Sequence, residues 1–168
     1  GGTEEVKDIP YIKQPDLLRL ISESYTSLTS TYLLAAGLQA TAGLRVAELI
    51  GNEKQGGDIH GLTLEQARQL IRDGKTYILG KRNKYRWVYI VKIILGSGFN
   101  DFLRVMKDYY ASKTYEISRG GNDLFLPLIY DEYNNYLSFQ QRHHNIKIYG
   151  VKSNAIMENM KLTTHVLR

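Results

Sequence analysis

The chain of 168 residues has no cysteine, only three prolines and no apolar run close to the length of a membrane helix. Without cysteine it has no disulfide framework, no thiol nucleophile and no cysteine-ligated metal site. A membrane-spanning helix needs about 20 consecutive apolar residues. The first ten residues also lack the basic start and apolar centre of a signal peptide. These absences favour an intracellular protein with no membrane partner.

Two nucleotide-binding signatures are missing as well. The sequence contains neither the phosphate loop G-x-x-x-x-G-K-[ST] nor the dinucleotide fingerprint G-x-G-x-x-G, which argues against an enzyme dependent on ATP or NAD. His143 and His144 are adjacent, so on a helix they point in different directions and make poor joint ligands. We therefore expect no metal and no cofactor.

Acidic residues are scarce in the second part of the chain. The formal net charge is +5; residues 1–60 hold eight acids and five bases, whereas residues 61–168 hold nine acids and seventeen bases. Between Asp73 and Asp101 there are six bases and no acid. Such a stretch favours a polyanionic partner. From charge alone, a solvated basic surface is an equally good interpretation.

The spacing of apolar residues predicts a mainly helical α+β protein with one small antiparallel sheet. We expect helices over about 15–21, 27–40, 64–71 and 98–113, around Glu48, after Ser138 and from Thr163. Thr63 followed by Gln66 predicts a capping box at the start of the 64–71 helix. Residues 1–13 are expected to form a leader or linker before one domain, 14–168.

Residues 76–79 and 85–90 are rich in aromatic and β-branched side chains, which predicts two strands joined by the turn 80–84. Aromatic residues in strands most often pack in a core, and we expect this of Tyr77, Tyr85 and Tyr89. Stacking of Trp87 and Tyr89 on a sugar or a base is the alternative. Residues 124–128 predict a short strand or a buried connector.

Three local patterns follow one another along the chain. The first is TAGLRVAEL at 41–49, the second is GKRNKYR at 80–86, and the third is TTHVLR at 163–168. In order and spacing they resemble the tyrosine recombinase (phage-type integrase) family, whose motifs read T-G-L-R-x-x-E-L, G-K-G-N-K-x-R and T-x-H-x-L-R. The resemblance covers nearly the whole chain from residue 15 and implies the helical catalytic domain of that family.

The resemblance implies that Arg45, Lys81, His165 and Arg168 are catalytic when a tyrosine hydroxyl attacks a DNA phosphodiester. Charge then builds on the nonbridging oxygens, where preorganised cations lower the barrier most. Arginine suits this role because its planar fork binds phosphate through two bonds and stays protonated. Arg45 and Arg168 are expected to converge on one phosphate. Glu48 is expected to orient Arg45 or a neighbouring donor, although taken alone these two also fit a surface ion pair.

The turn 80–84 carries the candidate general acid. Lys81 is expected to protonate the departing 5′ oxygen, and Lys84 in the same turn is its rival. Arg82 stands where the family has a glycine, the residue that normally supplies a positive φ in such a turn. Arg82, Lys84 and Arg86 are expected to contact the DNA backbone.

The family's nucleophilic tyrosine follows the second arginine, whereas all thirteen tyrosines of this sequence precede Arg168. The resemblance thus implies a catalytic domain that is incomplete at its C-terminus and inactive alone. The full-length protein is expected to recombine or integrate DNA at specific sites through a 3′-phosphotyrosyl intermediate. Its expected partners are double-stranded DNA and further copies of itself on that DNA. A noncatalytic DNA-binding module of the same fold is the alternative.

Overall fold

The computed structural model describes residues 7–22, 30–113 and 123–168. Within them the chain is an α+β protein dominated by helices, which confirms the predicted fold class. The α-helices are α1 (Gln14–Ser22), α2 (Ser30–Ala42), α3 (Val46–Ile50), α4 (Leu64–Asp73), α5 (Phe99–Ser112), α7 (Tyr130–His143) and α8 (Thr164–Leu167). The strands are β1 (Pro10–Ile12), β2 (Lys75–Leu79), β3 (Tyr85–Tyr89) and β4 (Ile148–Gly150), and single 3₁₀ turns are η1 (Glu53–Gln55), η2 (Lys81–Asn83), η3 (Lys92–Ile94) and η4 (Gly96–Gly98).

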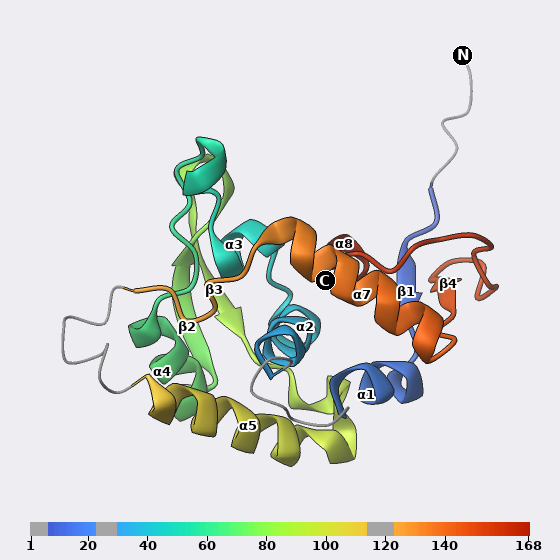
Figure 1. Cartoon of the computed structure of the whole chain (residues 1–168), viewed down its shortest axis with the longest axis horizontal. Coiled ribbons are helices and arrows are strands. Elements are labelled where there is room, and N and C mark those ends of the chain that lie inside the picture. The colour runs from blue at the N-terminus through green and yellow to red at the C-terminus, as the bar shows by residue number, and fades with distance from the viewer. Residues whose placement is uncertain (1–6, 23–29, 114–122) are drawn as a thin grey trace.

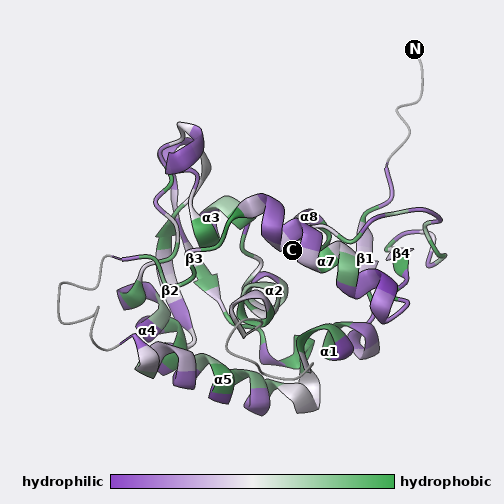
Figure 2. Cartoon of the chain, viewed as in Figure 1, coloured by the Kyte–Doolittle hydropathy of each residue, from purple (hydrophilic) through white to green (hydrophobic). Residues whose placement is uncertain are grey.

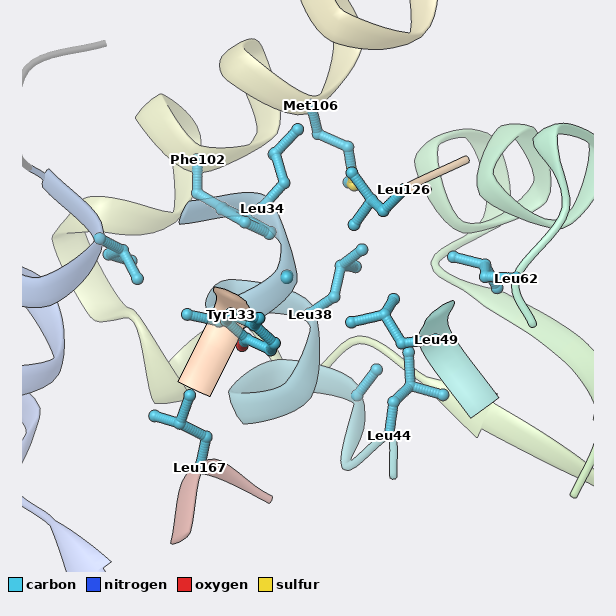
Figure 3. Close-up of a cluster of buried hydrophobic side chains, with 14 of the residues drawn as sticks. Leu34, Leu38, Leu44, Leu49, Leu62, Phe102, Met106, Leu126, Tyr133 and Leu167 are labelled. Atoms are coloured by element: carbon cyan, nitrogen blue, oxygen red, sulfur yellow. The ribbon is translucent and has the colours of Figure 1, made fainter. Parts of the chain in front are cut away.

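Helix α2 forms the centre of the core (Figure 1). Its sequence from Leu33 to Leu38 is apolar on every side, and such a helix is stable only when other elements cover all of it. Contacts with α1, α5 and α8 provide this cover. Leu34 and Leu38 of α2 lie among Phe102, Met106, Tyr133 and Leu167 (Figure 3).

Helix α4 begins as the sequence predicts. The amide of Gln66 donates to the Thr63 hydroxyl at 3.1 Å, and the amide of Thr63 donates to the Gln66 side-chain oxygen at 3.0 Å. This reciprocal pair satisfies amides that have no partner inside a helix. Helix α4 packs against β2, which fixes the hairpin that follows it.

Strands β2 and β3 form the predicted hairpin, with Tyr77 opposite Trp87 and Leu79 opposite Tyr85. One face of the hairpin is turned inward and holds Thr76, Ile78 and Val88, all buried. The opposite face is exposed, including Tyr77, Tyr85, Trp87 and Tyr89. The prediction that the strand tyrosines pack in the core is therefore wrong. Strand alternation sends them to the side opposite the buried residues.

Two further expectations need correction. Residues 10–12, assigned to a leader from their composition, form β1, which pairs antiparallel with β4, so the described chain has two small sheets. Helix α7 begins at Tyr130, well before Ser138, and its buried residues Tyr133 and Leu137 lie one turn apart. Asp131 and Glu132 stand in its first turn, where negative charge favours the helix dipole.

The remaining predictions agree with the described structure. The expected helix over 98–113 is α5, and residues 124–128 form a connector in which Phe125 and Leu126 are buried. Part of the expected helix over 27–40 is α2, whereas residues 27–29 lie outside the described residues. Among the described helices, none is long and apolar enough to cross a membrane.

Candidate functional site

A cleft of about 450 Å³ lies between α3 and the end of the β2–β3 hairpin. Its lining residues are Arg45, Glu48, Gly80, Arg82, Lys84, Tyr85 and Arg86, and we call it the arginine cleft. The lining thus joins the first and second of the three sequence motifs. Four of its seven residues are cationic and one is acidic, so the cleft suits an anion.

The single carboxylate of the arginine cleft is committed to an interaction inside the protein. Glu48 accepts two hydrogen bonds from the Arg86 guanidinium, from Nε at 3.0 Å and from Nη2 at 2.7 Å. The Glu48 side chain is fully buried, and that of Arg86 is 37% exposed. Arg86 also donates to the carbonyl of Gly43 at 3.2 Å. This two-bonded pair ties the hairpin to the segment that carries Arg45.

Glu48 is charged because its partners outweigh its burial. Burial alone raises the pKa of this carboxyl, but the hydrogen bonds from Arg86 and from the Arg45 amide lower it, as do the charges of both arginines. The net shift of the pKa is downward. The Glu48–Arg86 pair therefore carries no net charge. The positive charges of Arg45, Arg82 and Lys84 make the rest of the cleft lining cationic.

Arg45 is held through its backbone, which leaves its side chain exposed. Arg45 is the N-cap residue of α3, and its amide donates to the Glu48 carboxylate at 2.8 Å. In a capping box the side chain of the third helical residue bonds in this way to the N-cap amide. The sequence left open whether Glu48 orients Arg45 or a neighbouring donor. The geometry has it bonded to the backbone of Arg45 and to the side chain of Arg86.

The close contact between hairpin and α3 depends on a residue without a side chain. A Cβ added to Gly80 would lie 2.6 Å from Oε2 of Glu48, closer than such atoms approach. Gly80 also closes the hairpin by donating its amide to the carbonyl of Lys84 at 2.9 Å. Glycine here lets the hairpin reach the Glu48–Arg86 pair.

Arg168, at the far end of the sequence, does not line the arginine cleft, but its charge interacts with those of Arg45, Glu48 and Arg86. Partial burial lowers the pKa of its guanidinium; the positive charges of Arg45 and Arg86 lower it as well, and the charge of Glu48 acts in the opposite direction. Arginine stays protonated at neutral pH despite such a shift. Cations of the first and third motifs therefore repel one another, and a bound anion would relieve this repulsion.

A buried glutamine aligns these two segments from behind. Gln39 is fully buried in α2, and its side-chain nitrogen donates to the carbonyl of Leu44 at 3.0 Å and to that of Thr164 at 3.2 Å. Its oxygen accepts a hydrogen bond from the Tyr133 hydroxyl at 2.8 Å. Leu44 precedes Arg45 in the first motif and Thr164 precedes His165 in the third, so one amide binds the backbone of both motifs.

Tyr133 completes this buried group. Burial raises the pKa of its hydroxyl well above the ordinary value, with a further rise from Tyr136, so the hydroxyl stays protonated and donates to Gln39. Figure 3 shows Tyr133 close to Leu38 within the core. Gln39 is not among the site residues predicted from the sequence. A lone amide in an apolar helix was the signal that could have identified it, because buried polar groups require partners.

The turn at the hairpin tip has the shape that a glycine would favour. Arg82 and Asn83 both have positive φ angles, 63° and 55°. The hairpin thus adopts this conformation although arginine stands at the position of the family's glycine. Residues 81–84 of the tip are all charged or polar. The hydrophilic turn near the top of Figure 2 is η1. Lys81 begins η2, the 3₁₀ turn of the tip, but the Lys81 side chain lies outside what the structure describes.

The remaining sequence-predicted residues have distinct positions. Arg82 and Lys84 are exposed and line the arginine cleft, whereas Arg86 is bound to Glu48. His165 is exposed on α8, and it is not among the described residues that line the cleft. Across residues 7–22, 30–113 and 123–168, no group of three or more His, Asp or Glu side chains is arranged to hold a metal ion.

In comparisons with known proteins, no family model, no curated protein and no solved structure matches this chain.

Proposed function

We propose that this chain is the catalytic domain of a DNA strand-breaking and rejoining enzyme of the tyrosine recombinase type, acting in site-specific recombination or integration. The observation that carries the proposal is the approach of Arg168 to Arg45 beside the Glu48–Arg86 pair. These residues belong to three separate motifs that resemble the family. A surface ion pair between Arg45 and Glu48 would not explain why Arg86 binds Glu48, or why the charge of Arg168 interacts with both.

In the proposed reaction a tyrosine hydroxyl attacks a DNA phosphodiester and gives up its proton to solvent. A 3′-phosphotyrosyl bond forms, the bond to the 5′ oxygen breaks, and that oxygen takes a proton from the general acid. Arg45 and Arg168 donate hydrogen bonds to the nonbridging oxygens, on which negative charge grows. Glu48 holds Arg86 and the Arg45 amide, and so fixes the cations before DNA binds.

The proton comes from the hairpin tip. Lys81 is the proposed general acid, with Lys84, which lines the cleft, as its rival. His165 contributes to the phosphate site from α8. The resemblance implies that the attacking tyrosine follows Arg168, so residues 1–168 are expected to bind DNA without cutting it.

Double-stranded DNA is the proposed partner, with several copies of the protein assembled on it. The affinity should fall steeply with salt, because each phosphate contact contributes about −0.9 to the slope of log affinity against log salt. Arg45→Ala and Arg168→Ala should each remove one phosphate contact and so make that slope shallower by about 0.9. A flat affinity between low and moderate salt would argue against a DNA partner.

The decisive experiment uses the longer protein that includes the attacking tyrosine and a substrate with sulfur at the bridging 5′ position. A thiolate leaves readily without a proton, so this substrate bypasses the general acid. Lys81→Ala should lose about 10²–10⁴ in cleavage rate on ordinary DNA and recover on the sulfur substrate. Arg45→Ala and Arg168→Ala should lose about 10²–10³ and stay slow on both.

Each alternative outcome has a clear meaning. Rescue of Lys84→Ala alone assigns the acid to Lys84. Full activity of both arginine variants refutes the proposed phosphate site. Absence of any covalent adduct in the longer protein favours the noncatalytic DNA-binding module. An adduct formed by residues 1–168 alone refutes the later nucleophile and makes Tyr85, which lines the cleft, the first tyrosine to test.

A further inference from the structure

The outer face of the β2–β3 hairpin exposes a group of aromatic rings that the proposed reaction does not use. Tyr77 is 47% exposed, Tyr85 59%, Trp87 52% and Tyr89 55%. We call these four residues the aromatic face. They point away from Thr76, Ile78 and Val88, so they add nothing to the core. Exposed groups of large rings of this kind mark binding surfaces in many proteins.

Three of these rings form a continuous row. The Tyr77 ring centre lies 5.2 Å from that of Tyr85, with 24° between the ring planes, and 5.2 Å from that of Trp87, with 38°. Tyr77 and Trp87 are direct cross-strand partners, and Tyr85 is the diagonal neighbour of Tyr77. The backbone of the hairpin thus fixes the row, and a flat ligand can stack without reorganising it.

Cations lie at both ends of the row. Lys75 at the start of β2 has its ammonium 5.5 Å from the Trp87 ring centre. Arg82 and Lys84 are exposed at the opposite end, in the hairpin tip. Between Asp73 and Asp101 the sequence has no acidic residue, so the hairpin itself supplies no carboxylate to these cations. Asp73, at the end of α4, interacts with the charge of Lys75. A ligand that alternates flat apolar groups with negative charges matches this surface.

Single-stranded nucleic acid has that chemistry, and duplex DNA does not offer it. In a duplex the base faces are stacked on one another, and only base edges and phosphates are accessible. Unpaired bases stack on exposed aromatic rings while basic side chains follow the phosphates. A second copy of the same face is a poor occupant, because pairing two such faces brings Lys75, Arg82 and Lys84 of one copy close to those of the other.

We infer that the aromatic face binds single-stranded nucleic acid, with bases stacked on Tyr77, Tyr85 and Trp87 and phosphates beside Lys75, Arg82 and Lys84. This surface adjoins the arginine cleft, because Tyr85, Arg82 and Lys84 also line the cleft. Lys75, Tyr77 and Trp87 lie outside the lining of the cleft. The inference concerns a ligand and a surface that the proposed cleavage of duplex DNA does not require.

Trp87 is the only tryptophan of the chain, so its fluorescence reports directly on this surface. The experiment titrates the 168-residue protein with a twelve-residue oligothymidylate at low salt. Stacking should quench Trp87, and the midpoint should move to higher oligonucleotide concentration as salt rises. A hairpin duplex of the same length should quench much less at equal phosphate concentration.

Four variants separate stacking from folding and from the arginine cleft. Tyr77→Ala should weaken oligothymidylate binding about tenfold, because a base stacked on an aromatic ring is worth about 1–3 kcal/mol. Tyr77→Phe keeps the ring and should bind like the original protein. Tyr130→Ala removes an exposed tyrosine on α7 and should also leave binding unchanged. Arg45→Ala should keep full quenching, which separates this inference from the proposed function.

Three results would overturn the inference. The first is absence of quenching, and the second is quenching that Tyr77→Ala leaves intact. The third is Trp87 emission that shifts with protein concentration in the absence of nucleic acid, which identifies the face as a contact between copies. If circular dichroism shows that Tyr77→Ala does not fold, Lys75→Glu replaces it. This variant should weaken oligothymidylate binding and also lower the salt dependence of that binding.

Discussion

The inner and outer faces of the β2–β3 hairpin come from alternate residues of the same two strands, yet different interactions define them. On the inner face Arg86 is joined to the buried Glu48, and Thr76, Ile78 and Val88 are buried. On the outer face Tyr77 contacts the rings of Tyr85 and Trp87, and all of these side chains are exposed to solvent. The inner face is therefore specified by tertiary contacts, whereas the outer face is specified by the hairpin alone.

The comparison also separates two uses of arginine. Arg86 gives its guanidinium to the protein, through two bonds to Glu48 and one to Gly43. Arg45 and Arg168 are exposed and repel each other. A cation whose charge is matched inside the protein stabilises the fold, and a cation without such a match favours an external anion.

The largest expected effect comes from breaking the inner face. Glu48→Ala should lower the free energy of unfolding by about 3 kcal/mol, at the low end for a broken buried pair because Arg86 is partly solvated. Urea unfolding measures the loss. The control is Glu65→Ala, which breaks the exposed Glu65–Arg68 pair on α4 and should cost less than about 1 kcal/mol. Equal losses would contradict the special role of Glu48.

The pH dependence of the same pair has a defined sign. Because the pKa of Glu48 is lower in the folded protein than its ordinary value, its contribution to stability is present at neutral pH. That contribution is lost as the pH falls through the ordinary carboxyl range and then through the lowered pKa. The difference in unfolding free energy between the original protein and Glu48→Gln should therefore shrink as the pH falls.

A smaller loss is expected when the buried amide behind the inner face is removed. Gln39→Leu leaves two carbonyls and the Tyr133 hydroxyl without this partner, and should cost about 2 kcal/mol of stability. Tyr133→Phe removes one bond to Gln39 and keeps both carbonyl contacts, so it should cost about 1 kcal/mol. Gln39→Leu should also weaken duplex DNA binding through Arg45, while Trp87 quenching by oligothymidylate stays unchanged. Loss of both together would break the distinction between the two faces.

The smallest effect belongs to the tip that joins the faces. Arg82→Gly relieves the cost of a positive φ, about 1–2 kcal/mol, but it also gives the unfolded chain more freedom, about 0.4–1 kcal/mol. The net gain in stability should be about 0.5 kcal/mol. Arg82→Ala removes the same charge without relieving the backbone, and should show no gain. Both variants should reduce the salt slope of duplex DNA binding equally.

Local signals in the sequence predicted local structure well. Thr63 and Gln66 identified the start of α4, because both capping partners lie within one turn. The residues 80–84 identified the turn between β2 and β3 for the same reason. The sequence failed for β1, since three residues near the N-terminus become a strand only by pairing with β4. It also failed to extend α7 back to Tyr130.

For the candidate site, the sequence by itself determined which residue types are present and in what order: three motifs that each contain arginine, no cysteine, and a hairpin tip rich in cations. Only the tertiary structure decided that Arg86 binds Glu48, that the charge of Arg168 interacts with that of Arg45, and that Gln39 bonds to the backbone of the first and third motifs. It also decided that the strand aromatics are exposed. The reason is physical: capping and turn formation act over a few residues, whereas charge pairing, burial and the choice of an exposed face depend on segments that meet only when the chain folds.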